Sequence, residues 1–195
     1  MLRNGDKFNH KIYGRYKKDL LGDLHGTVVE IGPGSGVNFD YLPKDIEWIG
    51  VEPNESFHKT LQDKAKRLGL NARLVKGTAQ EIPLPDGSAD AVVCTLVLCS
   101  VPDPGAVARE IVRILKPTGK LAFIEHVAAQ EGTGLRKAQN LLNPVNRFFA
   151  DGCNCNRETW SILEHAGFSS LDLHHQVVKE AMSIHSPHIM GIATR

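Results

Sequence analysis

Short runs of β-branched and apolar residues alternate along this chain with longer amphipathic stretches. This alternation restricts the possible folds more than any other feature of the sequence. Five runs predict buried strands, at Thr27–Ile31, Trp48–Glu52, Arg73–Lys76, Asp90–Leu98 and Lys120–His126. One helix is expected to begin near Phe39–Leu42, and three more are expected at Ser56–Leu68, Pro104–Leu115 and Arg157–Ala166. Gly69 would end the first of these three, and a turn at Lys116–Gly119 would follow the second. Asn156 is placed to cap the third. This alternation predicts an α/β protein with a parallel sheet covered on both faces.

The last part of the chain departs from that alternation. Ser170–Val177 and His188–Thr194 have the pattern of two strands with no helix between them, so we expect them to pair antiparallel. Dinucleotide-binding dehydrogenases do not usually end this way. With 195 residues and no internal repeat or linker, the chain is expected to form a single domain. Within it, residues 1–25 would form a helical lid over a catalytic core of residues 26–195.

Charge and composition exclude several classes of protein. The formal net charge is +1 and 42% of the residues are hydrophobic, which is unlike the basic footprint of a nucleic-acid-binding protein. The basic residues near the N-terminus are expected to form a solvated helix face. No segment has the apolar length of a membrane span or of a signal peptide.

The four cysteines do not have the spacing of a disulfide framework. Cys94 and Cys99 lie in an apolar run, where reduced cysteines usually pack as small hydrophobic residues. Cys153 and Cys155 form a C-x-C pair without a second pair or a nearby histidine pair. We therefore expect no metal, and a reducing, cytoplasmic compartment.

Four predicted strand ends carry residues suited to an adenosine ligand. The first strand runs into a loop with three alternating glycines, which lets the backbone approach a ligand closely. About twenty residues later the second strand ends at Glu52, an acceptor for both ribose hydroxyls. The third ends at Thr78–Gln80, where an adenine would lie, and the fourth ends at Thr95–Leu96. Such ends meet at one edge of a parallel sheet, so we expect one site.

Glu30, directly before the glycine loop, helps to choose among adenosine cofactors. Its negative charge would repel a pyrophosphate. In addition, the loop has the pattern G-x-G-x-G rather than the G-x-G-x-x-G of dinucleotide-binding folds. A carboxylate here suits a cationic ligand, such as the amino group or sulfonium of S-adenosylmethionine. A structural role for Glu30 as a buried carboxylate remains the alternative.

From about Gly26 to Thr194 the chain resembles the class I S-adenosylmethionine-dependent methyltransferases that act on small molecules. Within them it is similar to the thiol methyltransferases of the animal endoplasmic reticulum and lipid droplets. The closer match is carried by Asp86–Ser88, Val92–Val101, Glu125–Val127, Asp151–Cys153, Arg157–Trp160 and Pro187–Gly191. The animal proteins have an N-terminal hydrophobic anchor that is absent from this sequence, which favours a soluble form.

This resemblance implies a Rossmann-like, doubly wound sheet of seven strands, mostly parallel, with S-adenosylmethionine as the cofactor. The glycine loop would line its methionine part, Glu30 would hold the amino group, Glu52 would bind the ribose and Thr78 to Gln80 would frame the adenine. The cofactor-binding residues expected are Glu30, Gly32, Pro33, Gly34, Ser35, Gly36, Asn38, Glu52, Pro53, Asn54, Thr78, Ala79, Gln80, Thr95, Leu96 and Cys99. The adenine position is often acidic in this superfamily, and Thr78 departs from that.

For methyl transfer from S-adenosylmethionine, the protein has mainly to align the methyl donor with the acceptor and to exclude water. A thiol acceptor must lose its proton, because the thiolate is the nucleophile. We consider His126 and Asp151 as catalytic residues, with Glu125 as a further assistant. Each has a structural alternative: His126 as a backbone-bonded histidine and Asp151 as a turn former. Residues 132–150 are expected to help form the acceptor pocket or merely to cover the sheet.

The favoured function is methylation of a small molecule, with an alkyl thiol as the best candidate acceptor. Methylation of an oxygen or nitrogen in another metabolite or lipid precursor is the main alternative. A non-catalytic protein that binds S-adenosylmethionine is the second. A nicotinamide-dependent oxidoreductase is disfavoured by Glu30 and by the paired C-terminal strands.

Overall fold

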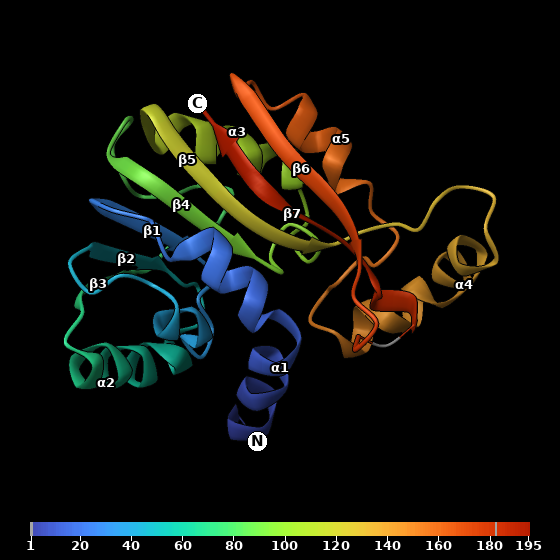
Figure 1. The fold of residues 1–195 in the computed structure, drawn as a ribbon, viewed down its shortest axis with the longest axis horizontal. Coiled ribbons are helices and arrows are strands. Elements are labelled where there is room, and N and C mark those ends of the chain that lie inside the picture. The colour runs from blue at the N-terminus through green and yellow to red at the C-terminus, as the bar shows by residue number, and fades with distance from the viewer. Residues whose placement is uncertain (1, 182) are drawn as a thin grey trace.

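The computed structural model describes residues 2–181 and 183–195, without the side chains of residues 2–4 and 183. One seven-stranded sheet runs through it in the order β3-β2-β1-β4-β5-β7-β6 (Figure 1). Its strands are β1 (Thr27–Ile31), β2 (Glu47–Val51), β3 (Asn71–Val75), β4 (Ala89–Thr95), β5 (Leu115–His126), β6 (Ser170–Val177) and β7 (Pro187–Thr194). The α-helices are α1 (Leu2–Leu21), α2 (His58–Leu68), α3 (Pro104–Ile114), α4 (Gly134–Phe149) and α5 (Thr159–Glu164).

The expected doubly wound, mostly parallel sheet is confirmed, including the antiparallel pair at its end. Strands β1 to β5 pair in parallel, whereas β7 lies antiparallel between β5 and β6. The strand order reverses between β1 and β4. In folds of this kind the ligand binds at such a switch point, beyond the carboxyl ends of the strands.

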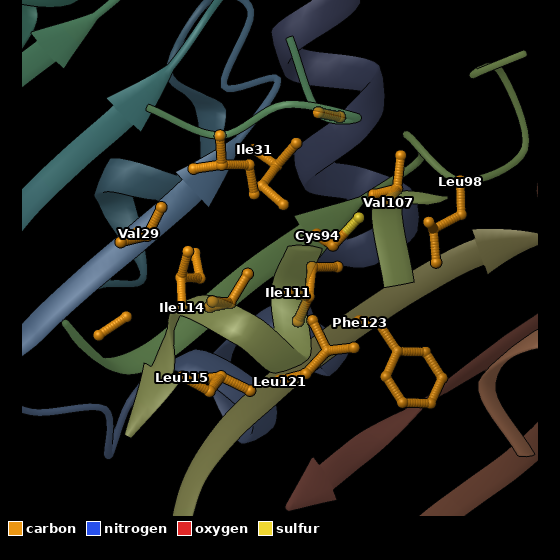
Figure 2. Packing of buried hydrophobic residues seen from close by; sticks show 14 of the residues in the cluster. Val29, Ile31, Cys94, Leu98, Val107, Ile111, Ile114, Leu115, Leu121 and Phe123 are labelled. Carbon is orange, nitrogen blue, oxygen red and sulfur yellow. The ribbon is translucent and has the colours of Figure 1, made fainter. Parts of the chain in front are cut away.

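Alternating strand residues build a separate core on each face of the sheet. Val29 and Ile31 of β1 point to the face covered by α3 and α5, where they meet Val107 and Ile111. Figure 2 shows side chains of β1, β4, β5 and α3 gathered in this cluster. Val28 points to the opposite face, which α1, α2 and the turn after β1 cover. The buried runs of the sequence therefore correspond to strands enclosed on both sides.

The N-terminal segment forms the expected helix, and the second half of α1 packs against the sheet while its first turns extend beyond the sheet edge (Figure 1). Ile12, Tyr13 and Leu21 are buried. Lys17 is only 1% exposed and its Nζ donates to Asn9 Oδ1 at 2.6 Å. Burial lowers the pKa of Lys17 to about 8, against the opposing effect of the Glu30 carboxylate. Whether this helix acts as a lid stays a prediction.

Several element boundaries differ from the expected ones. The helix expected near Phe39–Leu42 is a single 3-10 turn, η1 (Val37–Asp40), which begins directly after Gly36. The helix expected at Arg157–Ala166 is the shorter α5, preceded by Glu158. Asn156 does not cap it, because its side chain donates to Asn140 instead.

Two further boundaries differ for local reasons. A second 3-10 turn, η2 (Glu55–Phe57), precedes α2, and Gly69 ends that helix as expected, at φ 68°. The turn expected at Lys116–Gly119 lies within the first part of β5. There Thr118 adopts φ 67° and the pairing with β4 shifts its register between Ala89 and Ala91.

Helix α4 projects from the sheet (Figure 1). It carries a stripe of exposed apolar side chains. These side chains are Leu141, Leu142, Val145, Phe148 and Phe149. Within the described part of the chain, no helix combines the length and the apolar character needed to cross a membrane. A third 3-10 turn, η3 (Ser183–His185), packs against α4.

Candidate active site

The expected convergence of strand ends is present as a cavity of about 480 Å³ at the switch point of the sheet. Residues that follow β1, β2, β3 and β4 all contribute to its wall. The residues expected at the site that line it are Gly32, Glu52, Pro53, Asn54, Thr78, Ala79, Gln80, Leu96 and Asp151. The remaining expected residues do not contribute to its lining, and these are Glu30, Pro33, Gly34, Ser35, Gly36, Asn38, Thr95, Cys99 and His126.

Glu52 directly follows β2 and is fixed by two backbone donors. Gly34 N–H donates to Oε2 at 3.1 Å and Asn54 N–H donates to Oε1 at 2.9 Å. The side chain is 5% exposed and reaches the cavity wall. Each carboxylate oxygen has about two acceptor positions, so lone pairs remain for further donors. The carboxylate thus joins the glycine loop to the second strand and still presents acceptors to a ligand.

The glycine loop has the backbone shape that only glycine adopts without strain. Gly32, Gly34 and Gly36 have φ of 59°, 53° and 73°, in the left-handed region. Gly36 N–H closes the turn onto the Pro33 carbonyl at 2.8 Å. A Cβ at Gly34 would meet no atom of the described residues within 4 Å, whereas a Cβ at Gly32 would lie 3.0 Å from Val97. Open space thus lies where a ligand would approach the loop.

We expect Gly34→Ala to lower donor affinity much more than stability. The new methyl group would occupy the open space beside the loop and add strain of about 1 kcal/mol at positive φ. Gly69→Ala is a matched control, because Gly69 has φ 68° and its Cβ would also meet nothing within 4 Å. Calorimetric titration with S-adenosylmethionine should show a clear loss of affinity for the first variant alone. Equal affinities in both variants would show that the loop does not touch the donor.

Glu30 lies beneath the loop rather than on the cavity wall. It shares a face of β1 with Val28, so its side chain points under α1. Its Oε1 accepts from Asn38 Nδ2 at 2.8 Å and its Oε2 accepts from Trp48 Nε1 at 2.9 Å. Burial raises the pKa of Glu30, and these two donors oppose that shift. The side chain is 1% exposed, so any effect on a ligand would pass through Asn38.

Asn38 links Glu30 to the fourth strand. Its Nδ2 also donates to Thr95 Oγ1 at 3.0 Å. Its Oδ1 is buried and has no hydrogen-bond partner among the described residues. A buried polar atom of this kind is costly, so Asn38 Oδ1 is suited to accept a donor from a bound molecule. Ser35, on the same loop, instead donates to Asp6 of α1 at 2.7 Å.

The loop after β4 is shaped by Glu125, which is fully buried on β5. Its Oε1 accepts from the backbone N–H groups of Val97 and Leu98, and its Oε2 accepts from that of Cys99, at 2.9–3.0 Å. Leu96 takes a positive φ of 60° at the start of this turn. Burial raises the pKa of Glu125, and the three N–H groups oppose the shift. With both oxygens engaged, Glu125 positions the loop and does not line the cavity.

The two expected catalytic residues occupy different places. Asp151 lines the cavity, is exposed and has φ 45°, which also suits a turn former. His126 is half-buried behind the wall, and its Nε2 lies 3.4 Å from Tyr13 Oη. His126 Nδ1 lies 3.9 Å from Cys99 Sγ and 3.6 Å from Cys153 Sγ.

Although no histidine pair lies near Cys153 in the sequence, the fold brings His126 and Cys99 to it from other elements. The contact with Cys99 lowers the pKa of Cys153, and contacts with His126 and His185 act in the same direction. The same contact raises the pKa of Cys99, as does burial. Cys155 faces Asn143 instead. Cys99 is therefore part of a polar cluster and not only core packing.

The segment that follows α4 holds the β4 loop from the outside, which the sequence did not indicate. Asn154 Nδ2 donates to the carbonyl of Cys99 at 3.2 Å, and Arg157 Nη1 donates to the carbonyls of Leu98 and Val101. These bonds carry no periodicity and no motif that sequence reasoning could use. They make residues 151–157 a second support for the cavity wall.

Comparison with known proteins identifies the family. A family model described as a methyltransferase domain matches residues 29–123. Human thiol S-methyltransferase TMT1A is 37% identical over 172 residues, which cover 87% of this chain and 70% of the relative. Thiol S-methyltransferase TMT1B of Rattus norvegicus is 38% identical over 182 residues, covering 91% and 75%. The resemblance inferred from the sequence is thereby confirmed.

The fold is also shared with solved structures. A SAM-dependent methyltransferase from Aquifex aeolicus superposes with a TM-score of 0.67 at 18% identity, covering 95% of this chain and 92% of that one. This likeness shows the fold alone.

The residues present fit S-adenosylmethionine. The cavity presents carboxylate acceptors at Glu52, and beside it the glycine loop has open space at Gly34 and lies next to Asn38 Oδ1, which has no partner among the described residues. These features suit an ammonium group, two ribose hydroxyls and a close approach of the ligand to the backbone. The chain belongs to the methyltransferase domain family, together with the thiol S-methyltransferases TMT1A and TMT1B, and is an S-adenosylmethionine-dependent methyltransferase.

Proposed function

We propose that this enzyme methylates the sulfur of a small alkyl thiol. One observation carries the proposal: relatives at 37–38% identity over 87–91% of the chain are named thiol S-methyltransferases. The Val92–Val101 and Asp151–Cys153 segments, which carried the resemblance, enclose one side of the cavity. Substrate specificity resides in such segments more than in the shared fold.

For the donor, we propose that Glu52 binds the ribose hydroxyls and that Thr78, Ala79 and Gln80 frame the adenine. The glycine loop, with Asn38 supported by Glu30, would hold the methionine part. Thr95 and Leu96 would face the sulfonium, with Thr95 acting through its bond to Asn38. When bound, S-adenosylmethionine supplies an electrophilic methyl group on a positively charged sulfur.

The enzyme's own contribution is alignment of the acceptor and removal of its proton. Asp151 lies on the cavity wall and is placed to contact an acceptor, whereas His126 lies behind it beside Cys99. Leu96 and Val97 supply an apolar surface next to Ser100. We propose that the acceptor enters between this surface and Asp151. The cytoplasmic location remains a prediction from the reduced cysteines.

A panel of matched acceptors tests this proposal. The protein is incubated with S-adenosylmethionine that carries a deuterated methyl group and with an alkyl thiol, alcohol and amine of equal chain length, and a phenol. We expect labelled thioether from the thiol, with the other products lower by at least about tenfold, because the thiolate is the strongest nucleophile present near neutral pH. Preferred methylation of the phenol or amine would reassign the acceptor. Donor binding without any product would indicate a non-catalytic binding protein.

A further inference from the structure

Three potential metal ligands that the donor site does not use converge behind the cavity wall. Cys99 follows β4, His126 ends β5 and Cys153 follows α4. Their ligand atoms all lie within 4.8 Å of one another. Cys99 is 1% exposed and Cys153 is 5% exposed, and both are free thiols. Two thiols and an imidazole nitrogen in mutual contact can share a proton or bind a cation.

The spacing matches a tetrahedral metal centre. With Zn–S bonds of about 2.3 Å and Zn–N bonds of about 2.05 Å, the edges of a tetrahedron are about 3.5 Å between S and N and about 3.8 Å between two S atoms. The observed Nδ1 to Sγ distances are 3.6 Å for Cys153 and 3.9 Å for Cys99. Both Nδ1–Sγ distances thus lie within a few tenths of an ångström of the tetrahedral edge, and the two Sγ atoms, within 4.8 Å of each other, need a shift of at most about 1 Å.

The surroundings hold these ligands in place. Tyr13 Oη lies 3.4 Å from His126 Nε2, and such an outer contact can leave Nδ1 free to bind a metal. Glu125 accepts the Cys99 N–H at 3.0 Å, and Asn146 Nδ2 donates to the Cys153 carbonyl at 2.7 Å. The site is therefore supported by contacts from three separate elements, α1, β5 and α4.

We propose that Cys99, His126 and Cys153 bind a zinc ion whose fourth position is open to a thiol acceptor. A set of three protein ligands with two thiolates and one imidazole is a known arrangement for catalytic zinc, and thiolates select soft metals. Ser100, which follows Cys99, and Asp151, two residues before Cys153, line the donor cavity. The three ligands lie behind the cavity lining rather than in it, so an acceptor would reach the open position past Ser100 and Asp151.

The role of the open position rests on the proposed function, methylation of a thiol. The acceptor releases its proton to solvent as its sulfur enters the open position, since zinc binds the thiolate. The acceptor sulfur then forms a bond to the methyl carbon while the methyl–sulfonium bond breaks and leaves its electron pair on the donor sulfur. The neutral thioether formed is a poorer zinc ligand and dissociates.

Metal analysis tests the site independently of activity. We expect about one equivalent of zinc per chain in the wild-type protein after reconstitution and dialysis, and less than about a tenth of that in Cys99→Ser and Cys153→Ser. Cys155→Ser is the matched control, because this buried thiol lies two residues from Cys153 but contacts Asn143. Zinc should raise the melting temperature of the wild type and the control only. Retention of zinc in Cys153→Ser, or its absence from folded wild type, would overturn the site.

Cobalt substitution tests the open position. Cobalt bound to wild type should show the intense charge-transfer absorption of cobalt–thiolate bonds, and an added alkyl thiol should change the visible bands while the matching alcohol does not. His185 approaches Cys153 as well, so His185→Ala is included and should keep both metal and thiol response. Loss of metal in this variant would make His185 the fourth ligand and contradict an open position.

The outcomes separate this inference from the proposed function. Thiol methylation by protein that binds no zinc would leave the proposed function intact and refute the zinc site. Bound zinc with no thiol methylation would support the site and refute the acceptor. Titration of the free thiols completes the test. If metal-free wild type has two fewer free thiols than expected and Cys99→Ser does not, the two cysteines form a disulfide instead of a metal site.

Discussion

Replacing Glu52 by Gln should raise the Kd for S-adenosylmethionine by roughly a hundredfold. The carboxylate accepts from Gly34 and Asn54 and keeps lone pairs toward the cavity. Glutamine has nearly the same size but replaces one acceptor oxygen by an amide donor. Loss of charge-assisted bonds to two ribose hydroxyls costs about 3 kcal/mol in total, which corresponds to that factor.

Isothermal titration calorimetry with S-adenosylmethionine and S-adenosylhomocysteine measures this effect. Glu55→Gln is the control, because Glu55 lies three residues away and forms an exposed ion pair with Lys76. The control should bind with wild-type affinity, and thermal melts should show that both variants are folded. Wild-type affinity in Glu52→Gln would mean that the ribose is not bound at the end of β2.

Replacing Glu125 by Gln should cause the largest loss of stability among conservative substitutions near the site. Both oxygens of the fully buried carboxylate accept backbone N–H groups of residues 97–99. In glutamine, one of the two oxygens is replaced by an NH₂ group, which is itself a donor. At least one of the buried backbone N–H groups would then lose its acceptor. We expect a loss of about 2–4 kcal/mol in the free energy of unfolding.

Chemical denaturation gives the free energy of unfolding, with Glu164→Gln as control on the exposed surface of α5. The control should change stability by less than about 0.5 kcal/mol. Donor affinity should fall in Glu125→Gln as well, since Val97, one of the three residues whose N–H groups this carboxylate binds, lines the cavity. A variant as stable as wild type would show that the loop after β4 holds its shape without Glu125.

The sheet and the cavity could be predicted from the sequence because both follow from chain periodicity. Buried runs become strands, the carboxyl ends of parallel strands share one edge, and Glu52 and Thr78 therefore meet at one cavity. The antiparallel C-terminal pair followed from the missing helix between two strand-like runs.

Side-chain direction at a strand end could not be predicted in the same way. Glu30 precedes the glycine loop, yet the pleat of β1 turns it under α1 toward Trp48. The cluster of Cys99, His126 and Cys153 was missed because its members are separated by 26 residues or more along the chain and share no spacing rule. The prediction that Asn156 caps α5 was wrong, because the helix begins only after Glu158 and the Asn156 side-chain amide donates to Asn140 of α4.

A crystal structure of the protein with S-adenosylhomocysteine tests the account most directly. It should place the ribose hydroxyls within hydrogen-bond distance of Glu52, the adenine beside Thr78–Gln80 and the sulfur toward Leu96 and Ser100. A second cavity of about 980 Å³, lined by Lys76, Ile82 and Arg113 among others, adjoins this one. The adenosine seated there, or oriented with its ribose away from Glu52, would contradict the assignment of the donor site.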